Sequence, residues 1–204
     1  SLLGVGMLFL PRSWEEALQR SKAVVEEVLA ERGIPLLGWR EVPVDVDALG
    51  ERAQKTQPII QQVLTTVPDN IDANDPVAFD RELYLTRKII QARVISQGIN
   101  EFHFASFSSR TIVYKALTRA EDLPRFFDDL RNPAFKTRFG VFHRRFSTNT
   151  RTGWDKVQPF RLIAHNGEIN TIAGNHSRAY AREQNLGLPP DELLTHHSVS
   201  DSGA

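Results

Sequence analysis

The chain has 204 residues, of which 41% are hydrophobic, and this is enough to build one sizeable core. Its 25 basic and 25 acidic side chains balance, which argues against nucleic acid or a membrane surface as a partner. No apolar run approaches the roughly 20 residues that a transmembrane helix needs. There is no cysteine, so these residues supply no disulfide, thiolate metal ligand or thiol nucleophile, and we expect a cytoplasmic location.

The first third of the chain predicts one helix and three strands. An apolar run at Gly4–Leu10 ends at a proline and predicts a buried strand. Ser13 and Glu16 then fit a capping box at the start of a helix that Gly33 ends. Helical spacing predicts a buried stripe of Trp14, Ala17, Leu18, Ser21, Val24, Val25, Val28 and Leu29. Two more strands are expected at Leu36–Val42 and Ile59–Val67, separated by an irregular stretch at Pro43–Thr56 with one helical turn near Ala48.

The rest of the chain mixes helices with short strands. Asp75 is the expected cap of a second helix, with Pro76 at its first position and Gly98 at its end. The other predicted elements are a hairpin of Glu101–Phe107 with Thr111–Ala116, a short helix at Glu121–Leu130, strands at Arg138–Arg145 and Phe160–His165, and a long helix at Asn170–Gln184. This order predicts an α+β fold with a mostly antiparallel sheet, in one domain over residues 1–204.

Two dense polar clusters follow apolar runs in the stretch Phe142–Asn175. In the second cluster, Asn166 and Gly167 stand between a predicted strand and a helix, where a side-chain amide and a glycine N–H can form an oxyanion hole. The same dipeptide is also common in plain hairpin turns. In the first cluster, Arg144 and Arg145 end a strand, and an arginine fork there can bind a carboxylate or form an ordinary surface ion pair.

A third feature is Asp201, which is flanked by serines. It can accept a hydrogen bond from a substrate ammonium group, or simply cap a helix or a loop. Taken together, an arginine that can bind a carboxylate, an aspartate that can bind an ammonium group and a pair of oxyanion donors describe a site for a zwitterionic amino acid with a reactive side-chain carbonyl. Hydrolysis of glutamine needs that combination and, in addition, a nucleophile.

The sequence around these clusters resembles that of a known family. The runs HRRFSTNT, QPFRLIAHNGEINTIAGN and SDS are similar to the glutaminase domain of glutamate synthase large subunits, as are the upstream runs GVGMLFLP, LGWREVPV and FHFASFSSRTIVYKA. These domains are class II glutamine amidotransferases of the N-terminal-nucleophile hydrolase superfamily. The resemblance covers nearly the whole chain and implies an αββα sandwich, which we expect to be incomplete at the N-terminus and at the C-terminus.

The resemblance also implies roles for single residues. Arg145 matches the arginine that binds the α-carboxylate of glutamine, and Thr148 matches a residue that lines the same pocket. Asn166 and Gly167 match the oxyanion hole, and Asp201 matches the acid that holds the α-amino group. The family usually has a small residue at the position before Arg145, where this chain has another arginine.

The family's nucleophile is an N-terminal cysteine, and this chain contains none. The strand after Ser1 matches an internal strand of the family, so we expect Ser1 not to replace that cysteine and the chain alone to be inactive. No cofactor is expected in this fragment, and FMN and an iron–sulfur cluster are expected in the rest of the parent enzyme. Implied partners are L-glutamine, the remaining synthase domains and a small electron-transfer subunit or ferredoxin, and a homo-oligomer is a further expectation.

Two alternatives stay open at this point. The chain could be a non-catalytic module that binds glutamine or another amino acid, or it could belong to a different class II amidotransferase. The six histidines lack the spacing of a metal site, and we expect them to be structural.

Overall fold

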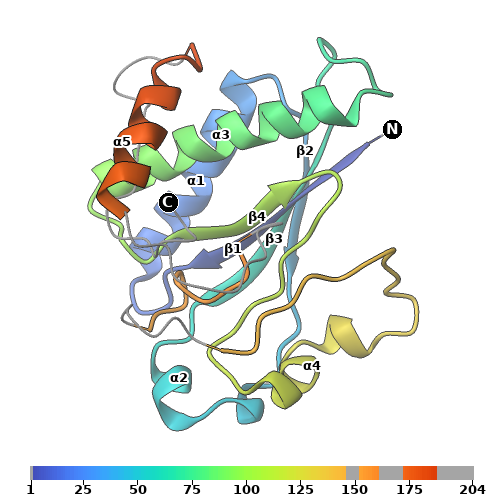
Figure 1. Cartoon of the computed structure of the whole chain (residues 1–204), viewed down its shortest axis with the longest axis vertical. Helices are drawn as coiled ribbons and strands as arrows, with labels where there is room; N and C mark the ends of the chain where they lie inside the picture. Colours follow the sequence, from blue (N-terminus) through green and yellow to red (C-terminus); the bar gives the residue numbers. More distant parts are fainter. Residues whose placement is uncertain (1, 146–151, 161–171, 188–204) are drawn as a thin grey trace.

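The computed structural model describes residues 2–145, 152–160 and 172–187. Its strands are β1 (Leu3–Leu10), β2 (Leu36–Glu41), β3 (Ile59–Thr66) and β4 (His103–Ser108), and its helices are α1 (Glu15–Glu31), α2 (Glu51–Lys55), α3 (Pro76–Ser96), α4 (Leu123–Phe126) and α5 (Ile172–Glu183). The strands form one antiparallel sheet in the order β2-β3-β1-β4 (Figure 1). The predicted α+β class with an antiparallel sheet is confirmed.

Strand β1 is central because the sequence makes it apolar on both faces. Leu8 and Leu10 point into one hydrophobic cluster, whereas Met7 and Phe9 point into a second cluster on the opposite face. All four side chains are buried. Since successive side chains of a strand alternate between faces, a continuous apolar run fits a strand that is covered on both sides.

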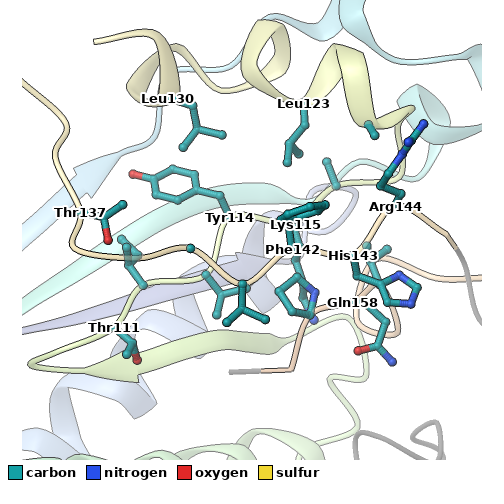
Figure 2. Close-up of a pocket in the computed structure, with 18 of the residues that line it drawn as sticks. Thr111, Tyr114, Lys115, Leu123, Leu130, Thr137, Phe142, His143, Arg144 and Gln158 are labelled. Atoms are coloured by element: carbon teal, nitrogen blue, oxygen red, sulfur yellow. The ribbon is translucent and has the colours of Figure 1, made fainter. Parts of the chain in front are cut away.

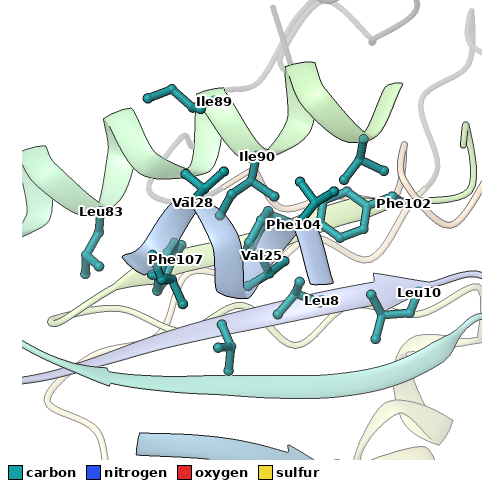
Figure 3. Close-up of a cluster of buried hydrophobic side chains, with 14 of the residues drawn as sticks. Leu8, Leu10, Val25, Val28, Leu83, Ile89, Ile90, Phe102, Phe104 and Phe107 are labelled. Carbon is teal, nitrogen blue, oxygen red and sulfur yellow. The ribbon is translucent and has the colours of Figure 1, made fainter. Parts of the chain in front are cut away.

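Helices α1 and α3 cover the first face (Figure 3). They contribute Val25, Val28, Leu83 and Ile90, which are all fully buried between the helices and the sheet. Helix α5 joins this layer through an ion pair of 2.5 Å between Lys88 of α3 and Glu183. The stripe predicted for α1 is buried except at Trp14, which stays 52% exposed at the start of the helix.

The opposite face is covered by irregular chain instead of long helices. Phe126 and Phe127 of the α4 region and Trp154 of the segment 152–160 pack there against Met7 and Phe9. The ring centroids of Phe9 and Trp154 lie 5.7 Å apart in an edge-on arrangement. Two short helical turns, Val46–Ala48 and α2, lie at this side of the sheet, in the stretch that was expected to be irregular (Figure 1).

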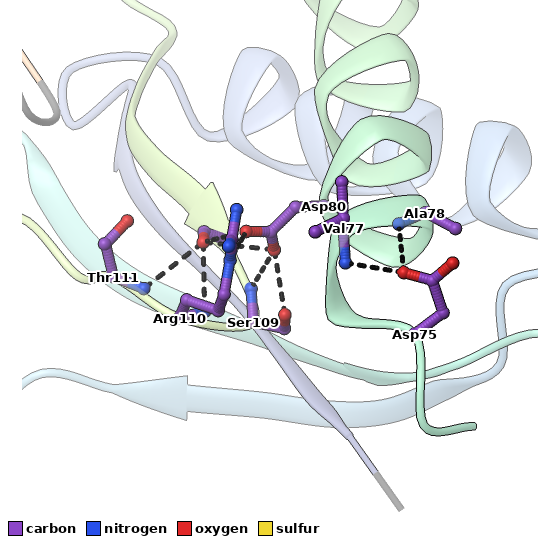
Figure 4. A network of polar contacts seen from close by, with 8 residues as sticks. Asp75, Val77, Ala78, Asp80, Ser109, Arg110 and Thr111 are labelled. Carbon is purple, nitrogen blue, oxygen red and sulfur yellow. Dashed lines mark hydrogen bonds and ion pairs between the residues drawn. The ribbon is translucent and has the colours of Figure 1, made fainter. Parts of the chain in front are cut away.

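Both predicted ends of α3 are confirmed, but the prediction of a capping box at the start of α1 is wrong. The Asp75 carboxylate accepts hydrogen bonds from the Val77 and Ala78 N–H groups at 3.0 and 2.9 Å, as expected of a cap before a proline (Figure 4). Helix α1 instead starts one residue later than expected, with Trp14 as its cap and no side-chain hydrogen bond there. Glu16 therefore stands one position too early to close a capping box.

The prediction of a second hairpin strand at Thr111–Ala116 is also wrong, because these residues form no strand. The Thr111 N–H donates to the Ser108 hydroxyl at 3.2 Å, and the Val113 N–H donates to the Ser106 hydroxyl at 3.1 Å. Serine side chains thus accept hydrogen bonds from backbone N–H groups that would otherwise pair with a neighbouring strand. The chain then crosses the sheet face, where the Tyr114 hydroxyl lies 3.4 Å from the Gln62 amide of β3.

Asp80 of α3 fixes the turn that sends the chain across the sheet (Figure 4). Its carboxylate accepts from the Ser109 N–H at 2.7 Å, from the Ser109 hydroxyl at 2.8 Å and from Arg110 Nε at 2.6 Å. Burial alone would raise the pKa of Asp80, but these hydrogen bonds together hold that pKa below its usual value.

The predicted helix Glu121–Leu130 is broken into three short pieces, of which α4 is the middle one. Phe126 and Phe127 are both fully buried, and the backbone becomes extended at Phe127. There the Phe126 carbonyl accepts from the Asp45 N–H at 2.9 Å, and Val44 and Phe127 form a β-bridge. This pairing with the chain after β2 ends the helix.

Three predictions concern the last part of the chain. Helix α5 confirms the long helix expected at Asn170–Gln184. Residues 138–145 form no strand, because no described segment pairs with their backbone. The strand predicted at Phe160–His165 falls outside the described residues after its first position.

Candidate functional site

A cavity of about 420 Å³ lies on the face of the sheet that long helices do not cover (Figure 2). Three stretches that are far apart in sequence line it, residues 110–120, 135–145 and 157–159, together with Leu123 and Leu130. Most of its wall is apolar, from Val113, Phe142 and similar side chains. Its lining residues include six basic ones, Arg110, Lys115, Arg119, Lys136, Arg144 and Arg145. A hollow with an apolar body and a few charged groups is the usual form of a small-molecule site.

Arg145 is the one predicted site residue that the described part of the chain contains. It is exposed at this cavity, and its backbone N–H donates to the His143 ring nitrogen Nδ1 at 3.2 Å. An exposed arginine at a cavity can bind a ligand carboxylate through its guanidinium group. Thr148, Asn166, Gly167 and Asp201 lie outside the described residues, so their roles stay predictions.

The segment that precedes the predicted oxyanion turn in the sequence also lines this cavity. Gln158 and Pro159 line it, only eight residues or fewer before Asn166 in the sequence. The segment 152–160 is held from below by Trp154, which is 7% exposed and donates through its ring N–H to the Thr56 hydroxyl at 3.3 Å. The first two residues of the first polar cluster and the segment that precedes the second cluster therefore meet at one cavity.

A polar network under the cavity joins the sheet to its irregular cover. Asp129 accepts from Arg40 at 2.8 and 2.5 Å, and from the Tyr114 hydroxyl at 2.7 Å. The hydrogen bond from Arg40 holds the pKa of Asp129 below its usual value, even though burial opposes this. Burial raises the pKa of Tyr114 far above its usual value, and the neighbouring carboxylate adds to that effect. Tyr114 therefore stays a neutral donor and Asp129 a charged acceptor at neutral pH.

Lys115 is a buried charged residue at this cavity. Only 2% of the residue is exposed, and its ammonium group donates to the carbonyl oxygen of Asp155 at 2.9 Å. The same nitrogen lies 4.6 Å from the centroid of the Phe160 ring. A lysine is rarely buried to this degree unless partners hold it.

A second hollow, of about 810 Å³, adjoins the first and shares Thr118, Arg119, Ala120 and Arg144 with it. Its wall carries both signs of charge, including Arg125, which pairs with Asp45 at 3.1 Å. Arg144 borders both hollows. The mixture of charges gives this hollow no clear preference for a ligand.

Sequence patterns did not predict four residues that support the site, namely Asp80, Tyr114, Lys115 and Asp129. One signal was present: Lys115 follows an apolar run, Ile112-Val113-Tyr114, where a solvated side chain is unexpected. Among the described residues, no group of three or more histidine, aspartate or glutamate side chains is placed to hold a metal ion. Within the same residues, no helix is both long and apolar enough to cross a membrane.

Comparisons with known proteins point to one family. The family model described as "Glutamine amidotransferases class-II" matches residues 1–197. Similar curated proteins include the chloroplastic ferredoxin-dependent glutamate synthase of Oryza sativa subsp. japonica, 46% identical over 91% of this chain, and the glutamate synthase [NADPH] large chain of Azospirillum brasilense, 40% identical over 92%. Ferredoxin-dependent glutamate synthase 2 of Synechocystis sp. is 46% identical over 90% of the chain. The chain spans only 11–12% of the length of these relatives.

Proposed function

The chain belongs to the class II glutamine amidotransferases, and from that premise we propose that it forms part of the glutamine-hydrolysing, ammonia-supplying domain of a glutamate synthase. The observation that carries the proposal is the meeting of Arg145 with the segment 157–159 at one cavity, because this segment leads directly to Asn166 and Gly167. The match to relatives named as glutamate synthases supports this parent enzyme. Neither a non-catalytic module nor another amidotransferase is favoured by any of these matches.

In the proposed reaction, Arg145 binds the α-carboxylate of glutamine through its planar fork. Asp201 holds the α-amino group, and Thr148 lines the pocket. A cysteine thiolate from outside these 204 residues attacks the side-chain amide carbon, and Asn166 and Gly167 stabilise the oxyanion that forms. The carbon–nitrogen bond breaks, the nitrogen takes up a proton and leaves as ammonia, and water then hydrolyses the thioester to glutamate.

The cofactors of the synthase reaction are assigned to other parts of the parent enzyme. An iron–sulfur cluster is held by cysteine thiolates, and this chain has no cysteine, so its residues do not fit that group. We place FMN and the cluster in the remaining domains, where the ammonia would serve to form glutamate from 2-oxoglutarate. Ferredoxin or an electron-transfer subunit would act on those domains. Cytoplasmic location stays a prediction, since several relatives are named as chloroplastic.

The direct test of the substrate site compares two neighbouring arginines in the complete enzyme. Replacing Arg145→Ala removes the carboxylate contact, so the KM for glutamine should rise by about 10-fold or more, as expected for a charged hydrogen bond of about 1.5–3 kcal/mol. The matched control is Arg144→Ala, for which the KM should change by less than about threefold. An unchanged KM in the Arg145 variant would refute the proposed site.

A second test concerns the 204-residue chain alone. Ammonia release from glutamine should not exceed the background, because the chain contains no cysteine to act as the nucleophile. Turnover that disappears on Ser1→Ala would show that a serine has taken over this role and would overturn the prediction.

A further inference from the structure

His143 holds the backbone of Arg145 at the edge of the cavity. Its ring nitrogen Nδ1 accepts a hydrogen bond from the Arg145 N–H at 3.2 Å. Both residues are exposed and both line the cavity, where Figure 2 shows the His143 side chain. An imidazole can accept through Nδ1 only when its proton is on Nε2. The neutral ring of His143 therefore serves here as an acceptor for the backbone.

The segment 135–145, which ends in this hydrogen bond, is held at its other end by an aromatic contact. There the Phe135 ring packs edge-on against Tyr114, with the ring centroids 5.6 Å apart. In the described part of the chain, the backbone of residues 140–145 pairs with no other segment. Phe142 does not anchor this stretch either, because 82% of the residue is exposed. The hydrogen bond to the histidine ring is therefore the contact that orders the end of the segment.

The same type of turn occurs elsewhere in the chain with aspartate or asparagine as the acceptor. Asp45, Asp72 and Asn132 each accept from the backbone N–H two residues later, at 3.0, 2.9 and 2.9 Å. Bonds of this kind restrict the backbone dihedral angles of the residues that they enclose. At residues 143–145, these angles set the direction in which the Arg145 side chain leaves the backbone.

We propose that His143 is a positioning residue, which fixes the backbone of Arg145 and thereby directs its guanidinium group to the α-carboxylate of glutamine. The inference rests on the proposed function, in which Arg145 binds that carboxylate. His143 acts only through the Arg145 backbone and takes no part in the bond changes. The carboxylate contact is the same in the bound substrate and in the transition state, so loss of His143 should raise KM and leave kcat unchanged.

The test measures glutamine hydrolysis by the complete enzyme and compares His143→Leu with His143→Asn. Leucine provides no acceptor, whereas the Oδ1 atom of asparagine can accept from the N–H two residues later, as it does at Asn132. In His143→Leu, KM should rise about three- to tenfold, the effect of one hydrogen bond, while kcat changes by less than about twofold. His143→Asn should keep KM within about twofold of the wild-type value.

A double-mutant cycle with Arg145→Ala separates positioning from direct contact with the substrate. If His143 acts only through Arg145, adding His143→Leu to Arg145→Ala should change KM by less than about twofold. Additive effects would mean that His143 contacts glutamine by itself, and would overturn the inference. An unchanged KM in His143→Leu, or an equal rise in His143→Asn, would also overturn it. Thermal unfolding checks that the variants fold, and His143→Ala takes the place of His143→Leu if the leucine variant does not.

The failure of this inference can be told apart from the failure of the proposed function. If Arg145→Ala raises the KM for glutamine but His143→Leu does not, the site assignment holds and the role of His143 is wrong. If Arg145→Ala leaves KM unchanged, the proposed substrate site itself has failed.

Discussion

The two faces of the sheet are built by different rules. One face packs against two long helices, and its buried cluster is aliphatic and aromatic, with Leu83, Val25 and Phe104 as typical members, although small hydroxyl side chains such as Ser21 and Thr86 are also buried on these helices. The other face is covered by irregular chain, and its apolar cluster is interrupted by buried polar groups such as Gln62 and Lys115. Only the second face carries the cavity at which Arg145 lies.

This difference separates stability from chemistry. Apolar burial against regular helices supplies most of the favourable free energy of folding, and it requires no particular polar contact. Irregular segments can present charged and amide groups to a cavity, but each buried polar group then needs its own partner. We therefore expect substitutions on the helix-covered face to change stability, and substitutions on the cavity face to change stability less and activity more.

The largest effect on stability should come from the helix-covered face. Leu83→Ala removes a fully buried side chain of α3 and should lower the free energy of unfolding by about 2–5 kcal/mol. Urea denaturation measures this, with Val77→Ala as the matched control. Val77 is 63% exposed on the same helix, so its loss should cost less than about 0.5 kcal/mol. Equal costs for the two variants would contradict the assignment of this face as the main core.

A smaller effect is expected at Asp80, which links α3 to the chain that enters the cavity face. Asp80→Asn weakens the bonds to Ser109 and Arg110 and should cost about 1–3 kcal/mol at pH 7. The pKa of Asp80 is lowered in the folded state, so its contribution is present above the unfolded pKa of about 3.9 and is lost as the pH falls through the folded value. The gap between wild type and variant should therefore narrow below about pH 4.

Urea denaturation at a series of pH values checks this prediction. Asp69→Asn is the control, because Asp69 is exposed and should leave the stability nearly unchanged at every pH. A gap between wild type and Asp80→Asn that stays constant down to pH 2 would show that the charge of Asp80 does not matter.

The smallest effect is expected within the network beneath the cavity. Tyr114→Phe removes the hydroxyl that donates to Asp129 at 2.7 Å, while the pair of Arg40 with Asp129 remains. The loss of this hydrogen bond, together with the longer one from the Gln62 amide at 3.4 Å, should cost about 1 kcal/mol. Thermal unfolding measures the change, and Tyr180→Phe serves as the control because Tyr180 is 59% exposed on α5. A destabilisation no larger than that of the control would mean that the network adds nothing to stability.

The helix-covered face was largely predictable from sequence. The apolar run of β1, the helical stripe of α1 and the cap of α3 at Asp75 are local patterns, and the structure confirms them. Each depends on residues that are close in sequence, where propensity and periodicity act directly. The predicted start of α1 is wrong by one residue, because Trp14 and not Ser13 occupies the cap position.

The cavity face was predicted much less well, and the reason is physical. Thr111–Ala116 has the composition of a strand, but serine hydroxyls and Asp80 hold its entry, so the chain crosses the sheet. The helix expected at Glu121–Leu130 breaks where Phe127 pairs with Val44, more than 80 residues away. Long-range contacts of this kind leave no periodic signal. The site residues were predicted from sequence motifs, and only Arg145 among them lies in the described structure.

The central claim is that this chain carries the oxyanion site of a glutamine-hydrolysing enzyme. Its most direct test is the steady-state hydrolysis of glutamine by the complete enzyme with Asn166→Ala. The loss of one oxyanion donor should lower kcat by about 100- to 1000-fold while KM stays nearly constant, because this contact forms only in the transition state. A kcat within about twofold of the wild-type value would contradict the claim.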